Sequence, residues 1–184
     1  QIVVTDTVFG DLDGRAPVTR AGARPGDVVA VCGRLGWAEA GLAVLNRGFR
    51  SPAAVVNAHR VPEPPYGQGR VAAAAGATAM VDVSDGLLSD LGHIAGASGV
   101  VVDVATARLA IAEPQTAVAA ALGGRDPLDF VLAGGDDHAL AACFPPGRVP
   151  QGWREIGQVL AGDPGVLVDG SVRDGVTGWT HFAG

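Results

Sequence analysis

Two aspartates and a serine in the segment AMVDVSDGLLSDL, residues 79–91, have the types and spacing that chemistry on a phosphate would need. An apolar run predicts a buried strand over residues 79–83, and the chain then turns directly into a helix. Because side chains alternate along a strand, Asp82 and Ser84 share a face, and Asp85 follows at the bend. The two carboxylates can therefore converge on one hard cation such as Mg²⁺.

The same turn could also bind a phosphate group. Ser84 and the free N–H groups of the first helical turn point to the same side, and Gly86 would let a phosphate approach the backbone. A structural alternative uses the same residues: Ser84 would cap the helix, and the neighbouring acids would complement the helix dipole. The spacing alone leaves both interpretations open.

A second candidate is the run Gly134-Gly135-Asp136-Asp137, which precedes a predicted strand. The two glycines allow positive φ, and two adjacent carboxylates would project from a tight loop. These acids could bind a cationic substrate or a metal ion. An Asx turn with solvated acids is the alternative, and the residues by themselves favour it.

Three further features give weaker signals. The run Gly33-Arg34-Leu35-Gly36 suggests a phosphate cradle, but it matches neither the dinucleotide fingerprint nor a P-loop. Arg20 lies in a polar turn, where a solvated arginine is the usual outcome. Trp179 could stack on a flat ligand, although a core position is the more common fate of a tryptophan. The histidines show no metal spacing and no paired nucleophile, so we expect all four to be structural: His59, His93, His138 and His181.

Alternating strand and helix patterns must position these residues. The predicted strands cover residues 1–9, 28–32, 79–83, 100–104, 138–144, 153–160 and 166–168. The predicted helices cover residues 37–46, 51–58, an Ala-rich segment that ends at Gly76, 85–98, 114–122 and 127–133. We expect the last two strands to form a hairpin. The fold class is therefore α/β or mixed α+β.

The composition excludes several classes of protein. Of the 184 residues, 48% are hydrophobic and 17% charged, which excludes a disordered or collagen-like chain. A formal net charge of −6 argues against nucleic acid or an anionic membrane as the main partner. All 13 basic residues are arginines, which removes a P-loop lysine and lysine-based catalysis. Cys32 and Cys143 lie far apart in apolar surroundings, which favours buried free thiols in a reducing cytosol, and no apolar run is long enough to span a membrane.

Six sequence blocks, spread over nearly the whole chain, carry a resemblance to a known family. The most specific blocks are VDVSDGL at residues 81–87, DLGHI at 90–94 and ASG at 97–99. The others are PVTRAGARPGD at 17–27, GGDD at 134–137 and GWTHF at 178–182. Together they resemble the thiamine-monophosphate kinase family, within the superfamily of ATP-using synthetases that also contains aminoimidazole ribonucleotide synthetase.

The resemblance implies an architecture in two parts. Residues 23–184 would form the C-terminal α/β domain of the aminoimidazole ribonucleotide synthetase-like fold, with a mixed sheet and packed helices. Residues 1–22 would be the end, including the last strand, of an N-terminal domain that binds ATP and forms a dimer interface, so we expect a homodimer. The family also has acid-rich motifs for further Mg²⁺ ions in that domain. Because the 184 residues lack these motifs, we expect them to be inactive alone.

The resemblance also implies an activity: Mg²⁺-dependent transfer of the ATP γ-phosphoryl group to thiamine monophosphate, which gives thiamine diphosphate and ADP, in the cytoplasm. The residues that it implies are Asp82 and Asp85 for Mg²⁺, Arg20 and Ser84 for ATP, and Asp136 and Trp179 for thiamine. The Gly-Gly-Glu of the family is Gly-Gly-Asp here, so the acid that would contact thiamine is one methylene shorter. Two alternatives stay open: another ATP-dependent synthetase of the superfamily, and a non-catalytic ligand-binding domain.

Overall fold

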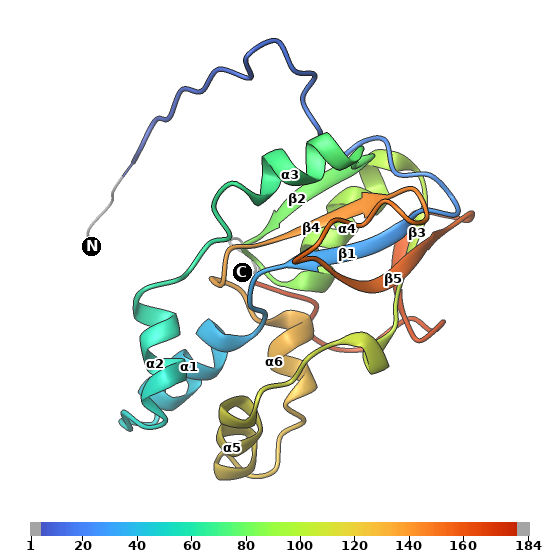
Figure 1. Ribbon diagram of the computed structural model, residues 1–184. Helices are drawn as coiled ribbons and strands as arrows, with labels where there is room; N and C mark the ends of the chain where they lie inside the picture. Colours follow the sequence, from blue (N-terminus) through green and yellow to red (C-terminus); the bar gives the residue numbers. More distant parts are fainter. Residues whose placement is uncertain (1–4, 180–184) are drawn as a thin grey trace.

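The computed structural model describes residues 5–179 and contains a six-stranded mixed sheet with helices on both faces (Figure 1). The strands are β1 (Val28–Cys32), β2 (Ala79–Val83), β3 (Val101–Val104), β4 (Ala139–Phe144), β5 (Arg154–Leu160) and β6 (Gly165–Val168). The helices are α1 (Trp37–Asn46), α2 (Ala53–Arg60), α3 (Gln68–Ala75), α4 (Leu87–Ser98), α5 (Glu113–Ala121), α6 (Leu128–Ala133) and the short 3₁₀ helix η1 (Thr106–Arg108). The strand order is β2-β4-β1-β5-β3-β6, and all neighbours are antiparallel except β3 and β6. The predicted fold class is confirmed.

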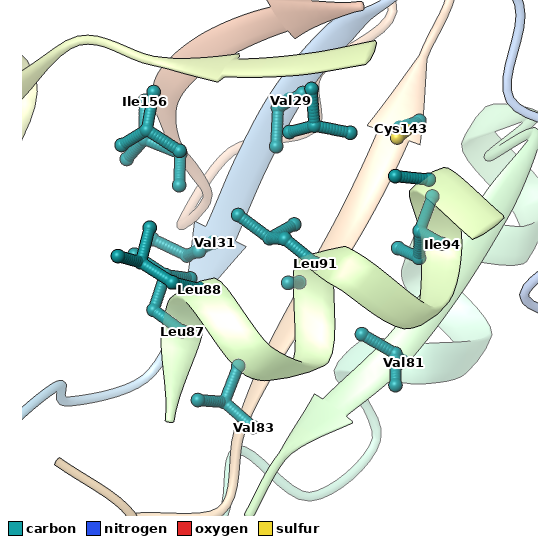
Figure 2. Packing of buried hydrophobic residues seen from close by; sticks show 14 of the residues in the cluster. Val29, Val31, Val81, Val83, Leu87, Leu88, Leu91, Ile94, Cys143 and Ile156 are labelled. Atoms are coloured by element: carbon teal, nitrogen blue, oxygen red, sulfur yellow. The ribbon is translucent and has the colours of Figure 1, made fainter. Parts of the chain in front are cut away.

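Helix α4 covers one face of the sheet, where alternate strand residues point toward it (Figure 2). Leu87, Leu91 and Ile94 are fully buried because their spacing of three to four residues forms one stripe of the helix. The strand residues beneath this stripe include Val29, Val31, Val81, Val83 and Cys143. Each buried side chain of this kind contributes about 1.5–3 kcal/mol to the free energy of unfolding. This layer therefore fixes α4 and the loop that leads into it.

Helix α3 covers part of the opposite face of the sheet. Its Ala72 belongs to a smaller cluster that includes Phe144 and Trp153, whose rings meet edge to face with centroids 5.4 Å apart. Cys32 lies in this cluster, whereas Cys143 lies in the cluster under α4. Both thiols are buried and free, and they face opposite sides of the sheet.

Helices α1, α2, α5 and α6 form a second group beyond one end of the sheet (Figure 1). Each of these helices contributes buried side chains to one cluster, which includes Val44, Val55, Val118 and Phe130. Gly41 of α1 lets α2 come close, because a Cβ at this position would clash with the carbonyl oxygen of Val55. The close approach sets the relative position of α1 and α2, whose residues form one wall of the site described below.

The helices and strands predicted over residues 28–168 are confirmed to within about two residues at their ends, but the predicted hairpin is wrong. Strands β5 and β6 do not pair with each other, because β3 lies between them and pairs with both. Val102 and Val104 of β3 are fully buried, so an interior position in the sheet keeps them away from water.

The predicted first strand is also wrong over its described part. Residues 5–9 pair with none of the six strands, and an isolated strand would leave its backbone N–H and C=O groups unpaired. Residues 1–4 of that prediction lie outside the described residues. Within residues 5–179, no helix has the length and apolar character that crossing a membrane requires.

Candidate functional site

A cavity of about 220 Å³ opens where three loops meet helices α1 and α2. The loop between β2 and α4 contributes Ser84 and Asp85, and the loop before β4 contributes Gly135 and Asp136. Trp179 comes from the segment after β6. The remaining wall consists of Ala38, Glu39 and Leu42 of α1 and His59 of α2. The fold thus brings four of the six predicted site residues to one cavity.

The loop between β2 and α4 is shaped by a buried carboxylate that the sequence analysis did not single out. Asp90 is 3% exposed, and its Oδ2 accepts hydrogen bonds from the backbone N–H groups of Ser84, Asp85 and Gly86 at 3.0, 3.0 and 3.2 Å. Burial raises the pKa of Asp90, while these N–H donors lower it. Asp90 therefore folds the loop back onto the first turn of its own helix.

This arrangement contradicts the Ser84 cap and leaves the phosphate interpretation open at the N–H groups of the first helical turn, which begins at Leu87. The N–H groups of residues 84–86 are already bound by Asp90, so they are not open to a phosphate. Ser84 does not cap the helix, because the N-cap position is held by Gly86 with φ 131°, and no side chain caps it. A Cβ on Gly86 would also lie 2.6 Å from the carbonyl oxygen of Ala133. The side chains of Ser84 and Asp85 line the cavity.

The two glycines before Asp136 serve close packing and not positive φ, contrary to the prediction. Gly134 has φ −74°, and a Cβ on Gly135 would clash with the carbonyl oxygen of Ser84. The N–H of Asp136 donates to that same oxygen at 2.9 Å. The positive φ values fall instead on Asp136, at 64°, and on His138, at 52°. The two loops are thereby held against each other, with the Asp136 side chain at the cavity.

The two adjacent aspartates have different roles, which neither interpretation of the run foresaw. Asp137 is only 4% exposed, and its carboxylate accepts hydrogen bonds from the N–H groups of Trp37 at 2.9 Å and Ala38 at 3.1 Å. It therefore caps α1 from a distant part of the chain. The N–H groups of Trp37 and Ala38 at this helix start are therefore bound by a protein carboxylate and are not open to a phosphate. Asp136 remains exposed.

Trp179 is 68% exposed, so a core position is excluded. The backbone N–H of Trp179 donates to the carbonyl oxygen of Asp85 at 2.8 Å. A Cβ on Gly178 would lie 2.6 Å from the same oxygen, so glycine is needed for this close approach. The backbone contact holds the indole beside the cavity, as stacking on a flat ligand would require.

Two predicted site residues lie apart from this cavity. Asp82 is exposed and lines a separate groove with Tyr66, His138 and other residues. Arg20 lies at the far end of α4, where its carbonyl oxygen accepts a hydrogen bond from Ser98 at 3.0 Å. Helix α4, which has 12 residues, separates the end near Arg20 from the β2–α4 loop by about 17 Å. The part of the chain that the structure describes has no group of three or more His, Cys, Asp or Glu side chains placed to hold a metal ion.

Sequence reasoning missed Glu39, Leu42 and His59 as residues of the cavity. Their spacing on α1 and α2 is that of ordinary amphipathic helices, and His59 was expected to be structural. Burial raises the pKa of Glu39, while Arg125 and His59 lower it. No signal in the sequence distinguishes this half-buried acid from a solvated one, because its burial depends on contacts between elements. His181 of the histidine prediction lies outside the described residues.

A mixed sheet covered by helices, with a cavity where the β2–α4 loop meets the loop before β4, defines a mixed α/β domain with a candidate site at this cavity. The family described as "AIR synthase related protein, C-terminal domain" matches residues 24–169, so the chain belongs to this family.

Within that family the chain is similar to thiamine-monophosphate kinases. It is 54% identical to the thiamine-monophosphate kinase of Mycobacterium tuberculosis (strain H37Rv) over 99% of this chain and 54% of the relative. It is 34% identical to that of Escherichia coli (strain K12) over 100% of this chain and 64% of the relative. The chain thus spans about half to two thirds of the length of these curated relatives.

Solved structures give the same result for the fold. The structure described as "AaThiL complexed with AMPPCP and TMP" superposes with a TM-score of 0.78 and 33% identity, over 90% of this chain and 54% of that one. The thiamine monophosphate kinase from Aquifex aeolicus superposes with a TM-score of 0.77 and 31% identity, over 86% of this chain and 55% of that one.

Proposed function

We propose that the protein containing this chain transfers the γ-phosphoryl group of ATP to the phosphate of thiamine monophosphate, giving thiamine diphosphate and ADP. The observation that carries the proposal is the meeting of Ser84, Asp85, Asp136 and Trp179 at one cavity. Relatives named thiamine-monophosphate kinase support it, as does a similar solved structure that is a complex with AMPPCP and TMP.

The acceptor is already an anionic phosphate, so the reaction needs little help from a general base. Catalysis then consists of aligning acceptor and donor and of neutralising negative charge. Asp136 and Trp179 would hold the thiamine part, because the thiazolium ring is a flat cation that suits a carboxylate and an indole face. Ser84 would donate a hydrogen bond to a phosphate oxygen of ATP. The shorter side chain at position 136 would place its carboxylate nearer to the backbone than a glutamate would.

Carboxylates suit a hard cation, because Mg²⁺ is usually held by one or two of them, water and the phosphates of the substrate, so Asp85 would hold Mg²⁺ at the cavity and Asp82 would do so only from its separate groove. Asp85 lines the cavity and Asp82 is exposed on β2, three residues earlier. When bound there, Mg²⁺ would neutralise charge on the transferring phosphoryl group. Asp90 would act indirectly, since its three hydrogen bonds fix the backbone from which the Asp85 side chain extends.

Further parts of the proposal concern the protein as a whole. Arg20 would contact ATP, and its position at the far end of α4 requires that this contact lie away from the 220 Å³ cavity or belong to another subunit. Residues 1–22 would belong to an N-terminal domain, and residues 23–184 would form the C-terminal one. We also propose a cytoplasmic homodimer, which gel filtration with light scattering would test.

The test supplies the complete gene product with ATP, Mg²⁺ and thiamine monophosphate and measures thiamine diphosphate by chromatography. We expect product from the parent protein and a loss of kcat of about 100-fold or more in Asp85→Asn, since one charge-stabilising group is removed. Asp163→Asn, an exposed aspartate outside the cavity, is the matched control and should behave like the parent. Absence of product from the folded parent protein would reject the kinase and favour a non-catalytic ligand-binding domain.

A further inference from the structure

The wall that α1 and α2 contribute to the 220 Å³ cavity carries two polar side chains, Glu39 and His59, that the proposed phosphate chemistry does not use. The Glu39 carboxylate is half-buried; Arg125 and His59 attract it electrostatically, but within residues 5–179 it takes part in no hydrogen bond. The Nδ1 atom of His59 is buried and also has no hydrogen-bond partner in the described part of the chain. Buried polar atoms normally find a partner, so the Nδ1 atom of His59 is an exception, and the half-buried Glu39 carboxylate lines the same wall.

Close backbone approaches hold both side chains at their bases. A Cβ on Gly134 would lie 2.7 Å from the Cβ of Glu39, so the loop before β4 packs directly on this side chain. A Cβ on Gly41 would lie 2.9 Å from the Cβ of His59, so α1 packs equally closely on α2. The fold therefore restricts the positions of the Glu39 and His59 side chains more than an open surface would. Leu42, one turn after Glu39, supplies apolar surface to the same wall.

The proposed function assigns two parts of the acceptor to residues of the cavity and leaves one part unassigned. Thiamine monophosphate carries its phosphate at one end, the thiazolium ring in the middle and an aminopyrimidine ring at the other end. In the proposed function the phosphate reacts beside Ser84 and Asp85, and the thiazolium ring lies at Asp136 and Trp179. The aminopyrimidine ring is then left to the α1–α2 wall, where it meets Glu39.

We propose that Glu39 determines specificity for the acceptor by accepting a hydrogen bond from the exocyclic amino group of its aminopyrimidine ring. This inference rests on the proposed function. A carboxylate accepts only, so it suits an amino donor and rejects a ring that presents an oxygen at the same place. Hydrogen bonds to a charged acceptor are also stronger than those between neutral groups. His59, on the neighbouring helix, forms the side of this pocket.

The test compares thiamine monophosphate with the analogue in which oxygen replaces the exocyclic amino group, using the complete gene product and saturating ATP and Mg²⁺. We expect the parent to prefer thiamine monophosphate by about 10- to 100-fold in kcat/KM. In Glu39→Gln the ratio of kcat/KM for thiamine monophosphate to kcat/KM for the analogue should fall to about one or below, because the amide can donate to the oxygen of the analogue. The KM for ATP should stay at the parent value.

Glu113→Gln is the matched control, because Glu113 is exposed at the start of α5 and outside the cavity. It should keep the parent ratio. If Glu39→Gln does not fold, Glu39→Asp withdraws the carboxylate by one methylene and should raise the KM for thiamine monophosphate but not for ATP. An active parent whose ratio is unchanged by a folded Glu39→Gln variant overturns this inference alone. A folded parent that makes no thiamine diphosphate rejects the proposed function, and the inference with it.

Discussion

Asp137 caps helix α1 at Trp37, although 100 residues separate the two in sequence: the Asp137 Oδ2 lies 2.9 Å from the Trp37 nitrogen. Asp136, the next residue toward the N-terminus, turns toward the cavity with φ 64°. One aspartate thus ties the loop to the helix that carries Glu39, while the other is presented to a ligand. The geometry of the site depends on this division between two chemically identical neighbours.

The pH dependence of stability should report the buried position of Asp137. Burial raises its pKa from 3.8 to about 6, although the N–H groups of Ala38 and Trp37 lower it. Between these values the folded protein binds more protons than the unfolded chain, so this group's contribution to the free energy of unfolding falls as pH rises from about 4 to about 6. In Asp137→Asn the titration is absent. The stability of the parent relative to this variant should therefore be greatest near pH 4 and level off above about pH 6.

Urea unfolding of both proteins at several pH values measures this difference. Asp163→Asn, which removes an exposed carboxylate, should show no such trend relative to the parent. A parent–variant difference that stays constant or grows over the interval would contradict the assignment of a raised pKa to Asp137.

Asp90→Ala should destabilise the protein by about 2–4 kcal/mol, because it leaves three backbone N–H groups of the β2–α4 loop without their acceptor. The loop would also lose its shape, so we expect kcat of the complete gene product to fall together with stability. Chemical denaturation and the thiamine diphosphate assay measure the two effects. Asp90→Asn keeps one acceptor oxygen and should lie between the parent and Asp90→Ala in both measurements.

Gly135→Ala should destabilise the protein by about 1–3 kcal/mol, because the new methyl group would clash with the carbonyl oxygen of Ser84. Gly96→Ala is a suitable control, since Gly96 lies within α4 and a Cβ there would meet nothing within 4 Å. That change should stabilise by about 0.5–1 kcal/mol through helix propensity. Opposite shifts in Tm would support a steric role for Gly135, and equal shifts would count against it.

Trp179→Ala should raise the KM for thiamine monophosphate by about 10-fold, because the exposed indole would no longer cover one face of the thiazolium ring. The free energy of unfolding should change little, since Trp179 is not part of the core. Steady-state kinetics with varied acceptor, together with thermal unfolding, tests both expectations. Phe49→Ala removes an aromatic side chain that is equally exposed but outside the cavity, and it should leave the KM unchanged.

Much of the fold could be predicted from the sequence because local patterns determine it. The spacing of Leu87, Leu91 and Ile94 predicts a helix with one apolar face, and the alternation in Ala79–Val83 predicts a strand. Glycines that end helices, such as Gly76 and Gly99, are equally local, and both have the expected left-handed conformation. The pairing of strands is not local, and for this reason the insertion of β3 between β5 and β6 escaped prediction.

In the candidate site too, some features follow from the local sequence and others only from contacts between distant parts of the chain. The sequence by itself determined the residue types at the cavity: an aspartate and a serine after a strand, an aspartate after two glycines, and a tryptophan near the end of the chain. Only the tertiary structure decided which carboxylates face a ligand. Asp90 and Asp137 are bound to backbone N–H groups inside the protein, whereas Asp136 and Glu39 line the cavity. The physical reason is that burial and hydrogen bonding, which decide what a carboxylate can do, come from residues far away in the chain.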